Sequence, residues 1–157
     1  MKFTLAAAAA LFTTALAGPV ARTDDTIYQI KDFTLRKLDG KNISTMFFRI
    51  LATNGGTLDF ECSPYDPVTD AATERFEPDH VYFCGKNSVF SFNYIPAHDT
   101  QTNELFLWQH ISETETLGGN AFLNDPICHA GGSNVNDFVC VVPPQEYFAI
   151  TMKKLGA

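Results

Sequence analysis

Four histidines are the first residues of this 157-residue chain to weigh as catalytic groups: His80, His98, His110 and His129. His80 follows an aspartate and His98 precedes one, but neighbouring residues on a strand point to opposite faces, so adjacency does not make a catalytic pair. A serine hydrolase of the common type needs its nucleophile on a strained turn, and the sequence G-x-S-x-G that forms this turn is absent. We therefore predict no catalytic residues and no enzyme activity.

Carboxylates and metal ligands lead to the same prediction. Asp59 and Glu61 are two residues apart on one expected strand and share a face, as the two carboxylates of a glycosidase must share a cleft. That face lies opposite the apolar residues of the strand, so solvated side chains explain the pair better. The chain has no C-x-x-C pair, and Cys128-His129 alone is a poor zinc ligand set. The sequence thus predicts neither a metal site nor a cofactor.

Residues 1–17 have the three parts of a secretory signal peptide. Lys2 gives a short positive region, an apolar run follows, and Ala15-Leu16-Ala17 offers small residues for cleavage. The apolar run is too short to span a membrane. We expect a secreted, extracellular protein whose mature chain starts at Gly18, with residues 18–25 as a loose arm and residues 26–157 as one domain.

The chain contains four cysteines, all of them after this segment: Cys62, Cys84, Cys128 and Cys140. An even number of cysteines behind a signal peptide indicates disulfides, because the compartments outside the cytosol are oxidising. Two intrachain bonds are expected, and the residues alone leave three pairings open.

The charge of the chain restricts its partners. Its 11 basic and 18 acidic residues give a formal net charge of −7, and loss of residues 1–17 would remove one lysine and leave −8. Such a chain repels phosphate backbones and anionic membranes, which argues against nucleic acid or a membrane as a partner. It would attract basic proteins instead, more strongly at low salt.

Alternating apolar residues predict short β-strands separated by turns. Residues 43–52 and 57–62 should form a hairpin around Asn54-Gly55, since glycine after asparagine supplies the positive φ that a tight turn requires. Residues 26–35 read as a strand with one break near Asp32. Residues 104–111 are apolar on both faces, with Phe106 and Trp108 on one of them, which is typical of a central strand or of a binding surface.

Other segments are predicted as connections. Gly118-Gly119-Asn120 is expected to be a turn, and residues 64–79 fit either a short helix or a surface loop. Because strands follow one another with no long helical period, we predict an all-β fold: a compact, single-domain antiparallel β-barrel or sandwich. Asn42-Ile43-Ser44 is an N-glycosylation sequon at a turn-to-strand junction, so we expect Asn42 to carry a glycan.

Three stretches of the chain resemble the Alternaria major allergen family of secreted fungal β-barrel proteins. They are LATNGGTLDFECS at 51–63, YFCGKNS at 82–88, and CHAGG at 128–132 followed by DFVC at 137–140. The resemblance implies the family's β-barrel over residues 26–157 and the disulfide pairs Cys62–Cys84 and Cys128–Cys140. It implies no catalytic residues, because none is established for the family.

The resemblance also implies a function outside the cell. Some family members are allergens, and others are elicitors that trigger plant defence and the hypersensitive response. Members have been linked to thaumatin-like defence proteins and to small flavonoid-like ligands. We therefore expect a secreted effector that binds a plant defence or surface protein of basic character. The alternatives are a carrier of a small aromatic ligand and, with less support, a secreted hydrolase.

This chain differs from the family's allergen at one position that matters for subunit assembly. The family's allergen has an additional cysteine near the start of the mature chain that links two subunits, and residues 23–28 contain no cysteine. A monomer is therefore expected. The sequence identifies no ligand-binding residues.

Overall fold

A computed structural model describes residues 26–78, 80–99, 102–143 and 147–156. These residues form strands and no helix. The strands are β1 (Thr26–Lys37), β2 (Thr45–Ala52), β3 (Asp59–Cys62), β4 (Tyr65–Asp66), β5 (Ala71–Ala72), β6 (Tyr82–Phe83), β7 (Phe90–Ile95), β8 (Asn103–Ser112), β9 (Glu115–Leu123), β10 (Ile127–Ala130), β11 (Phe138–Val141) and β12 (Phe148–Lys154). The predicted all-β fold is confirmed, whereas the signal peptide and arm expected at 1–25 lie outside the described residues.

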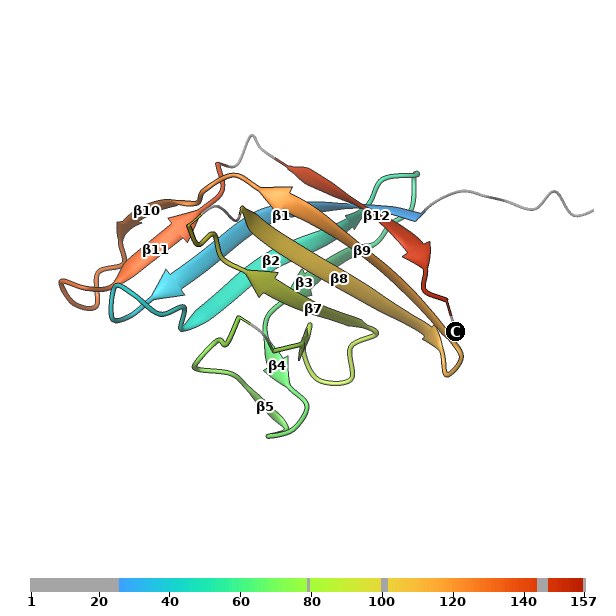
Figure 1. The fold of residues 1–157 in the computed structure, drawn as a ribbon, viewed down its shortest axis with the longest axis horizontal. Coiled ribbons are helices and arrows are strands. Elements are labelled where there is room, and N and C mark those ends of the chain that lie inside the picture. The colour runs from blue at the N-terminus through green and yellow to red at the C-terminus, as the bar shows by residue number, and fades with distance from the viewer. Residues whose placement is uncertain (1–25, 79, 100–101, 144–146, 157) are drawn as a thin grey trace, which may run out of the picture.

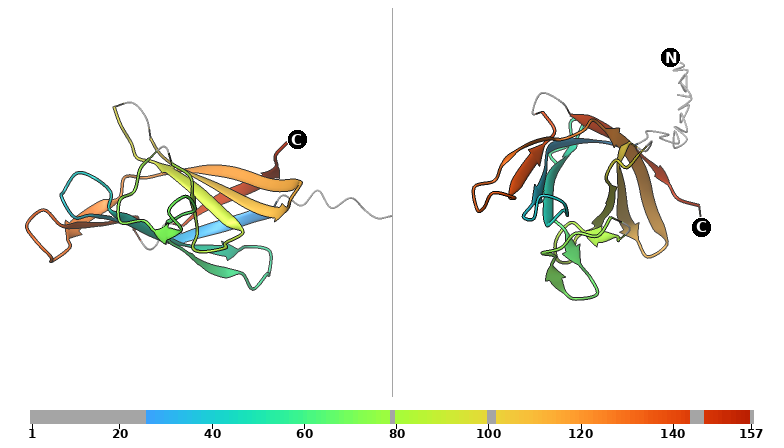
Figure 2. Two further views of the ribbon diagram at one scale, coloured as in Figure 1. Left: turned by 90° about the horizontal axis from the view of Figure 1, so that it is seen from below. Right: turned by 60° about the vertical axis from the view of Figure 1, so that its left-hand side comes forward.

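The strands belong to one antiparallel sheet that curls on itself (Figure 1). Its order is β10-β11-β1-β12-β9-β8-β7-β6-β4-β5, with β2 on the other edge of β1 and β3 beyond β2. β1 is long enough to pair with β12 along its first half and with β11 along its second. Figure 2 shows the result as a half-barrel, with the β10–β11 hairpin projecting from one side.

Aromatic rings fill the inside of the half-barrel. Phe48 of β2 lies 5.1 Å from Phe92 of β7, measured between ring centroids, and Phe33 of β1 lies 5.2 Å from Tyr94 of β7. All four side chains are essentially inaccessible to solvent. These contacts join the β1–β2 half of the sheet to the β7–β8 half, so the core forms between two parts of the same sheet.

The break expected in the first strand is a bulge. The register of β1 against β2 shifts between Lys31 and Thr34, and Asp32 has a φ of 55°. The extra residue lets both Ile30 and Phe33, an odd number of residues apart, point into the core. The predicted break near Asp32 is therefore confirmed, and its physical reason is core packing on both sides of it.

Gly118 and Gly119 lie within β9, so the predicted turn at these residues was wrong. A Cβ atom on Gly119 would lie 2.4 Å from the backbone oxygen of Thr151 in β12. No side chain fits in that space, and glycine within a strand often marks such a close approach of another backbone. The glycine pair thus allows β12 to cross from β1 to β9 and continue the sheet.

We expect Gly119→Ala to lower the free energy of unfolding by about 1–3 kcal/mol, since the added methyl group must displace the backbone of β12. Gly156→Ala is the matched control, because a Cβ atom there meets nothing within 4 Å. Urea denaturation of both variants measures the difference. Equal stability of the two variants would show that β12 does not approach β9 so closely.

Candidate functional site

His110 comes closest to a catalytic arrangement. Its Nε2 lies 3.2 Å from the hydroxyl oxygen of the buried Ser91, and its Nδ1 lies 3.3 Å from the hydroxyl of Thr116. In a hydrolase triad, a carboxylate contacts the second nitrogen and stabilises the protonated ring. A threonine hydroxyl occupies that place here, so the contacts fit a structural histidine whose two ring nitrogens are both satisfied.

The other histidines make simpler contacts. His80 Nε2 lies 3.6 Å from Asp66, and the exposed His98 lies 3.0 Å from the equally exposed Asp99. His129 is exposed on β10.

Within the described ranges, no group of three or more histidine, cysteine, aspartate or glutamate side chains is placed to hold a metal ion. No helix of the described residues is both long and apolar enough to cross a membrane.

One cavity reaches the core side of the sheet. It is lined in part by Leu35, Tyr94 and the Cys128–Cys140 disulfide, and its volume is about 220 Å³. Ligand pockets usually begin at roughly 300 Å³, so this space is small for an aromatic ligand. The Tyr94 hydroxyl donates to Asn103 at 2.7 Å, and burial raises the pKa of Tyr94. The cavity is therefore smaller than a typical ligand pocket, and a buried, hydrogen-bonded tyrosine forms part of its lining.

The outer side of β8 and β9 carries an apolar surface, which we call the outer aromatic face. Its apolar residues are Phe106, Trp108, Phe122 and Leu155, and the hydrogen-bonded pair Glu104 and Asn120 lies on the same face beside Phe122 and Phe106. The rings of Phe106 and Trp108 are stacked, with centroids 6.1 Å apart and planes 12° apart. Phe122 is 63% exposed and Leu155 is 45% exposed. The prediction of a central strand is confirmed, since β8 pairs with β7 and β9. Its outer face is partly exposed, and binding by that face stays a prediction.

The pairing of β8 with β9 explains how these side chains come together. Trp108 lies opposite Gly118. Because Gly118 has no side chain, Leu155 can lie beside Trp108 over this position. Sequence reasoning found Phe106 and Trp108 by their alternation, but it missed Phe122 and Leu155. Phe122 was missed because the adjacent glycines were taken for a turn rather than for the middle of a strand.

Two disulfides hold the sheet, as the expected fold required. Cys62–Cys84 connects the end of β3 to the residue after β6. Among the described strands β3 pairs with β2 alone, so this bond ties an edge of the sheet to its other half. Cys128–Cys140 joins directly opposed residues of β10 and β11. These are the two pairs that the family resemblance implies, and no cysteine is free.

A salt bridge anchors the β10–β11 hairpin to β1. The Arg36 guanidinium donates to both oxygens of Asp137, at 3.1 and 2.9 Å, and the Ser133 backbone N–H donates to the same carboxylate at 3.0 Å. The Arg36 contact, followed by the Ser133 bond, lowers the pKa of Asp137 to about 2. A side chain at Gly131 would collide with this carboxylate, which explains the glycine there.

We expect Asp137→Asn to destabilise the protein at neutral pH and to do so less as the pH falls. The folded-state pKa of about 2 lies below the unfolded value of about 3.9, so the ionised carboxylate stabilises the fold above about pH 4, and this stabilisation is lost toward pH 2. Melting temperatures of wild type and variant at pH 7, 4 and 2 measure the effect. Asp99→Asn, at an exposed site, is the control, and a difference that stays constant with pH would contradict the prediction.

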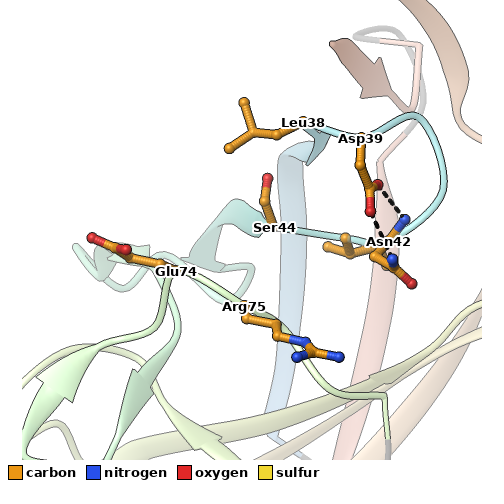
Figure 3. A pocket seen from close by; sticks show the side chains of 7 residues that line it. Leu38, Asp39, Asn42, Ser44, Glu74 and Arg75 are labelled. Atoms are coloured by element: carbon orange, nitrogen blue, oxygen red, sulfur yellow. Dashed lines mark hydrogen bonds between the residues drawn. The ribbon is translucent and has the colours of Figure 1, made fainter. Parts of the chain in front are cut away.

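Asn42 is exposed on the turn between β1 and β2, at the edge of a groove of about 440 Å³ (Figure 3). The Asp39 carboxylate accepts hydrogen bonds from the backbone N–H groups of Lys41 and Asn42 and from Asn42 Nδ2. These bonds, that of Lys41 first, lower the pKa of Asp39 to about 2. The groove is lined by Leu38, Asp39, Asn42, Ile43, Ser44, Glu74 and Arg75. Glycosylation of Asn42 remains a prediction.

Known proteins resemble this chain in both sequence and fold. A family model described as Alternaria alternata allergen 1 matches residues 30–140. The major allergen Alt a 1 of Alternaria alternata is 37% identical over 132 residues, which cover 84% of this chain and 76% of the allergen. Allergen Ulo b 1 of Alternaria botrytis is 36% identical over 122 residues, which cover 78% of this chain and 80% of that protein.

A solved structure of the first relative has the same fold. The crystal structure of Alternaria alternata major allergen Alt a 1 superposes with a TM-score of 0.70 at 34% identity. The match covers 85% of this chain and 97% of that chain.

Proposed function

The chain belongs to the Alternaria alternata allergen 1 family, and from this we propose that it is a secreted fungal effector that acts by binding a plant defence or surface protein. Its relatives are named as allergens, and the family is not a known enzyme family. The proposal includes elicitation of plant defence, up to the hypersensitive response, as the outcome of binding. It involves no turnover of a substrate.

The outer aromatic face is the observation that carries this proposal. Exposed apolar patches on a soluble protein mark contact surfaces, and tryptophan is among the residues most enriched at the centres of protein interfaces. Trp108 lies between Phe106 and Leu155 on this face, partly shielded and partly open. Such a surface suits a protein partner, because burying it gains apolar contact area without changing the core.

The charge of the chain favours a basic partner. At a formal net charge of −7, which becomes −8 if residues 1–17 are removed, the protein attracts positively charged proteins over several ångströms. Exposed charges are screened beyond about 8 Å at physiological salt. Basic thaumatin-like defence proteins of the plant apoplast are the partner class that we propose. Binding should therefore weaken as ionic strength rises, mainly through slower association.

We propose a monomer in the absence of a partner, because both disulfides are intrachain and use all four cysteines. Sedimentation without reductant tests this directly. A dimer that dissociates on reduction would contradict it.

Leaf infiltration tests the proposed function. Folded wild-type protein should provoke a defence response, and Phe122→Ser should weaken it because this change breaks the outer aromatic face. Phe47→Ser is the matched control, since Phe47 is a partly exposed phenylalanine on the outward side of β2. Cell-wall polymers are incubated with the same samples. Turnover of a polymer together with no leaf response would replace the proposal with a secreted hydrolase.

A further inference from the structure

The sequon Asn42-Ile43-Ser44 forms one wall of the surface groove. Ile43 is buried, and its carbonyl oxygen accepts a hydrogen bond from the backbone N–H of Phe76 at 3.1 Å. The backbone N–H and the hydroxyl of Ser44 both donate to the carbonyl oxygen of Arg36 at 2.8 Å. The sequon is therefore held against the 74–76 segment, and the groove between them has two fixed walls.

The acceptor side chain has a defined direction. One Nδ2 proton of Asn42 points to the Asp39 carboxylate, at a distance of 2.7 Å between nitrogen and oxygen, and the other is free for substitution. An N-linked asparagine keeps one N–H, so the bond to Asp39 survives modification. Because the pKa of Asp39 is about 2, the carboxylate stays an acceptor even in an acidic extracellular space. A sugar on Nδ2 thus starts from an oriented amide at the edge of the groove (Figure 3).

We propose that Asn42 carries an N-linked glycan whose first sugar occupies the groove between the β1–β2 turn and the 74–76 segment. The donor is an oligosaccharide on a lipid pyrophosphate. Nδ2 forms the bond to C1 of the first N-acetylglucosamine, the C1–O bond to the pyrophosphate breaks, and Nδ2 loses one proton. The inference concerns a different surface from the outer aromatic face. It shares with the proposed function only the premise that the chain enters the secretory pathway.

The composition of the groove matches a sugar. Leu38 offers an apolar side chain that is 45% exposed, and the apolar C–H face of a pyranose ring packs against such a surface. Arg75 and Glu74 are exposed and offer donors and acceptors for hydroxyl groups. In the described part of the chain, Arg75 makes no ion pair, so its guanidinium is available to the glycan. The groove has a volume of about 440 Å³.

The first arm of the test asks whether the glycan exists. The protein is secreted from a glycosylating yeast, and its intact mass is measured before and after complete deglycosylation. We expect the mass to fall and Asn42 to become aspartate. Asn42→Gln and Ser44→Ala should both appear without the glycan, whereas Ser44→Thr keeps the sequon and should carry it. A folded wild-type protein of unmodified mass would overturn the proposal.

The second arm asks whether the first sugar occupies the groove. An endoglycosidase leaves one N-acetylglucosamine on Asn42, and the same chain made in the bacterial periplasm carries none. The single-sugar form should melt like the fully glycosylated form and a few degrees above the bare form. Arg75→Ala should remove most of that difference without preventing glycosylation. A single-sugar form that melts like the bare protein would overturn the placement of the sugar.

Discussion

Replacement of Phe48 by alanine is expected to lower the free energy of unfolding by about 3–5 kcal/mol, the usual loss for a buried phenylalanine. The Phe48 side chain is fully buried at the centre of the half-barrel. Its ring contacts Phe92 edge-on at 5.1 Å and stacks on Phe33 at 6.1 Å, measured between centroids. The substitution removes these contacts and leaves a cavity where the two halves of the sheet meet, so the whole fold is affected.

Phe47→Ala is the matched control for this prediction. Phe47 precedes Phe48 on β2 and therefore points to the opposite, outward side of the sheet, where it is partly exposed. We expect Phe47→Ala to lower the free energy of unfolding by no more than about 1 kcal/mol, as most substitutions near the surface do. Urea denaturation of both variants gives the two values. A larger loss for Phe47→Ala would mean that β2 has the opposite register.

Replacement of both Cys62 and Cys84 by serine is expected to lower the free energy of unfolding by about 3 kcal/mol. In the chain-entropy model, a bond that spans 22 residues restricts the unfolded chain by roughly this amount. Both cysteines are also buried in the core, and the bond ties the free edge strand β3 to the segment after β6. Without it, the edge of β3 is held by β2 and by core packing alone.

Replacement of Cys128 and Cys140 by serine is the comparison. This bond spans 12 residues, so its loss should lower the free energy of unfolding slightly less than loss of the Cys62–Cys84 bond does. In addition, the Arg36–Asp137 salt bridge still holds the β10–β11 hairpin to β1. We expect the Cys128/Cys140 double variant to unfold at a higher urea midpoint than the Cys62/Cys84 double variant. Early cleavage by a protease should be confined to the hairpin. The reverse ranking of the two midpoints would contradict the structural roles given to the two bonds.

Local signals in the sequence were enough to predict much of the fold. The β2–β3 hairpin follows from alternation on both sides of Asn54-Gly55, and the bulge at Asp32 follows from a one-residue slip in the apolar pattern of β1. Each of these signals lies within about twenty residues. Of the candidate site, Phe106 and Trp108 could be found for the same reason, because they alternate with core residues of one strand.

Features that depend on distant residues were not predictable in this way. Gly119 is a strand residue because β12, some thirty positions later, crosses over it. Within the region predicted as a helix or a loop, residues 65–72 form the small β4–β5 hairpin, and β4 pairs with β6 beyond it. Leu155 joins the outer aromatic face only because Gly118 leaves space beside Trp108. A single sequence holds no signal for contacts of this kind.

The central claim, that the protein acts by binding a basic plant protein through its outer aromatic face, is tested most directly by a capture experiment. Immobilised wild type, Phe122→Ser and Phe47→Ser are exposed to plant apoplastic fluid at low and high salt, and the bound proteins are identified and their affinities measured. We predict that wild type and Phe47→Ser retain the same basic defence protein, more weakly at high salt, and that Phe122→Ser binds it about tenfold less tightly. Capture of nothing by folded wild type, or equal binding by all three proteins, would contradict the claim.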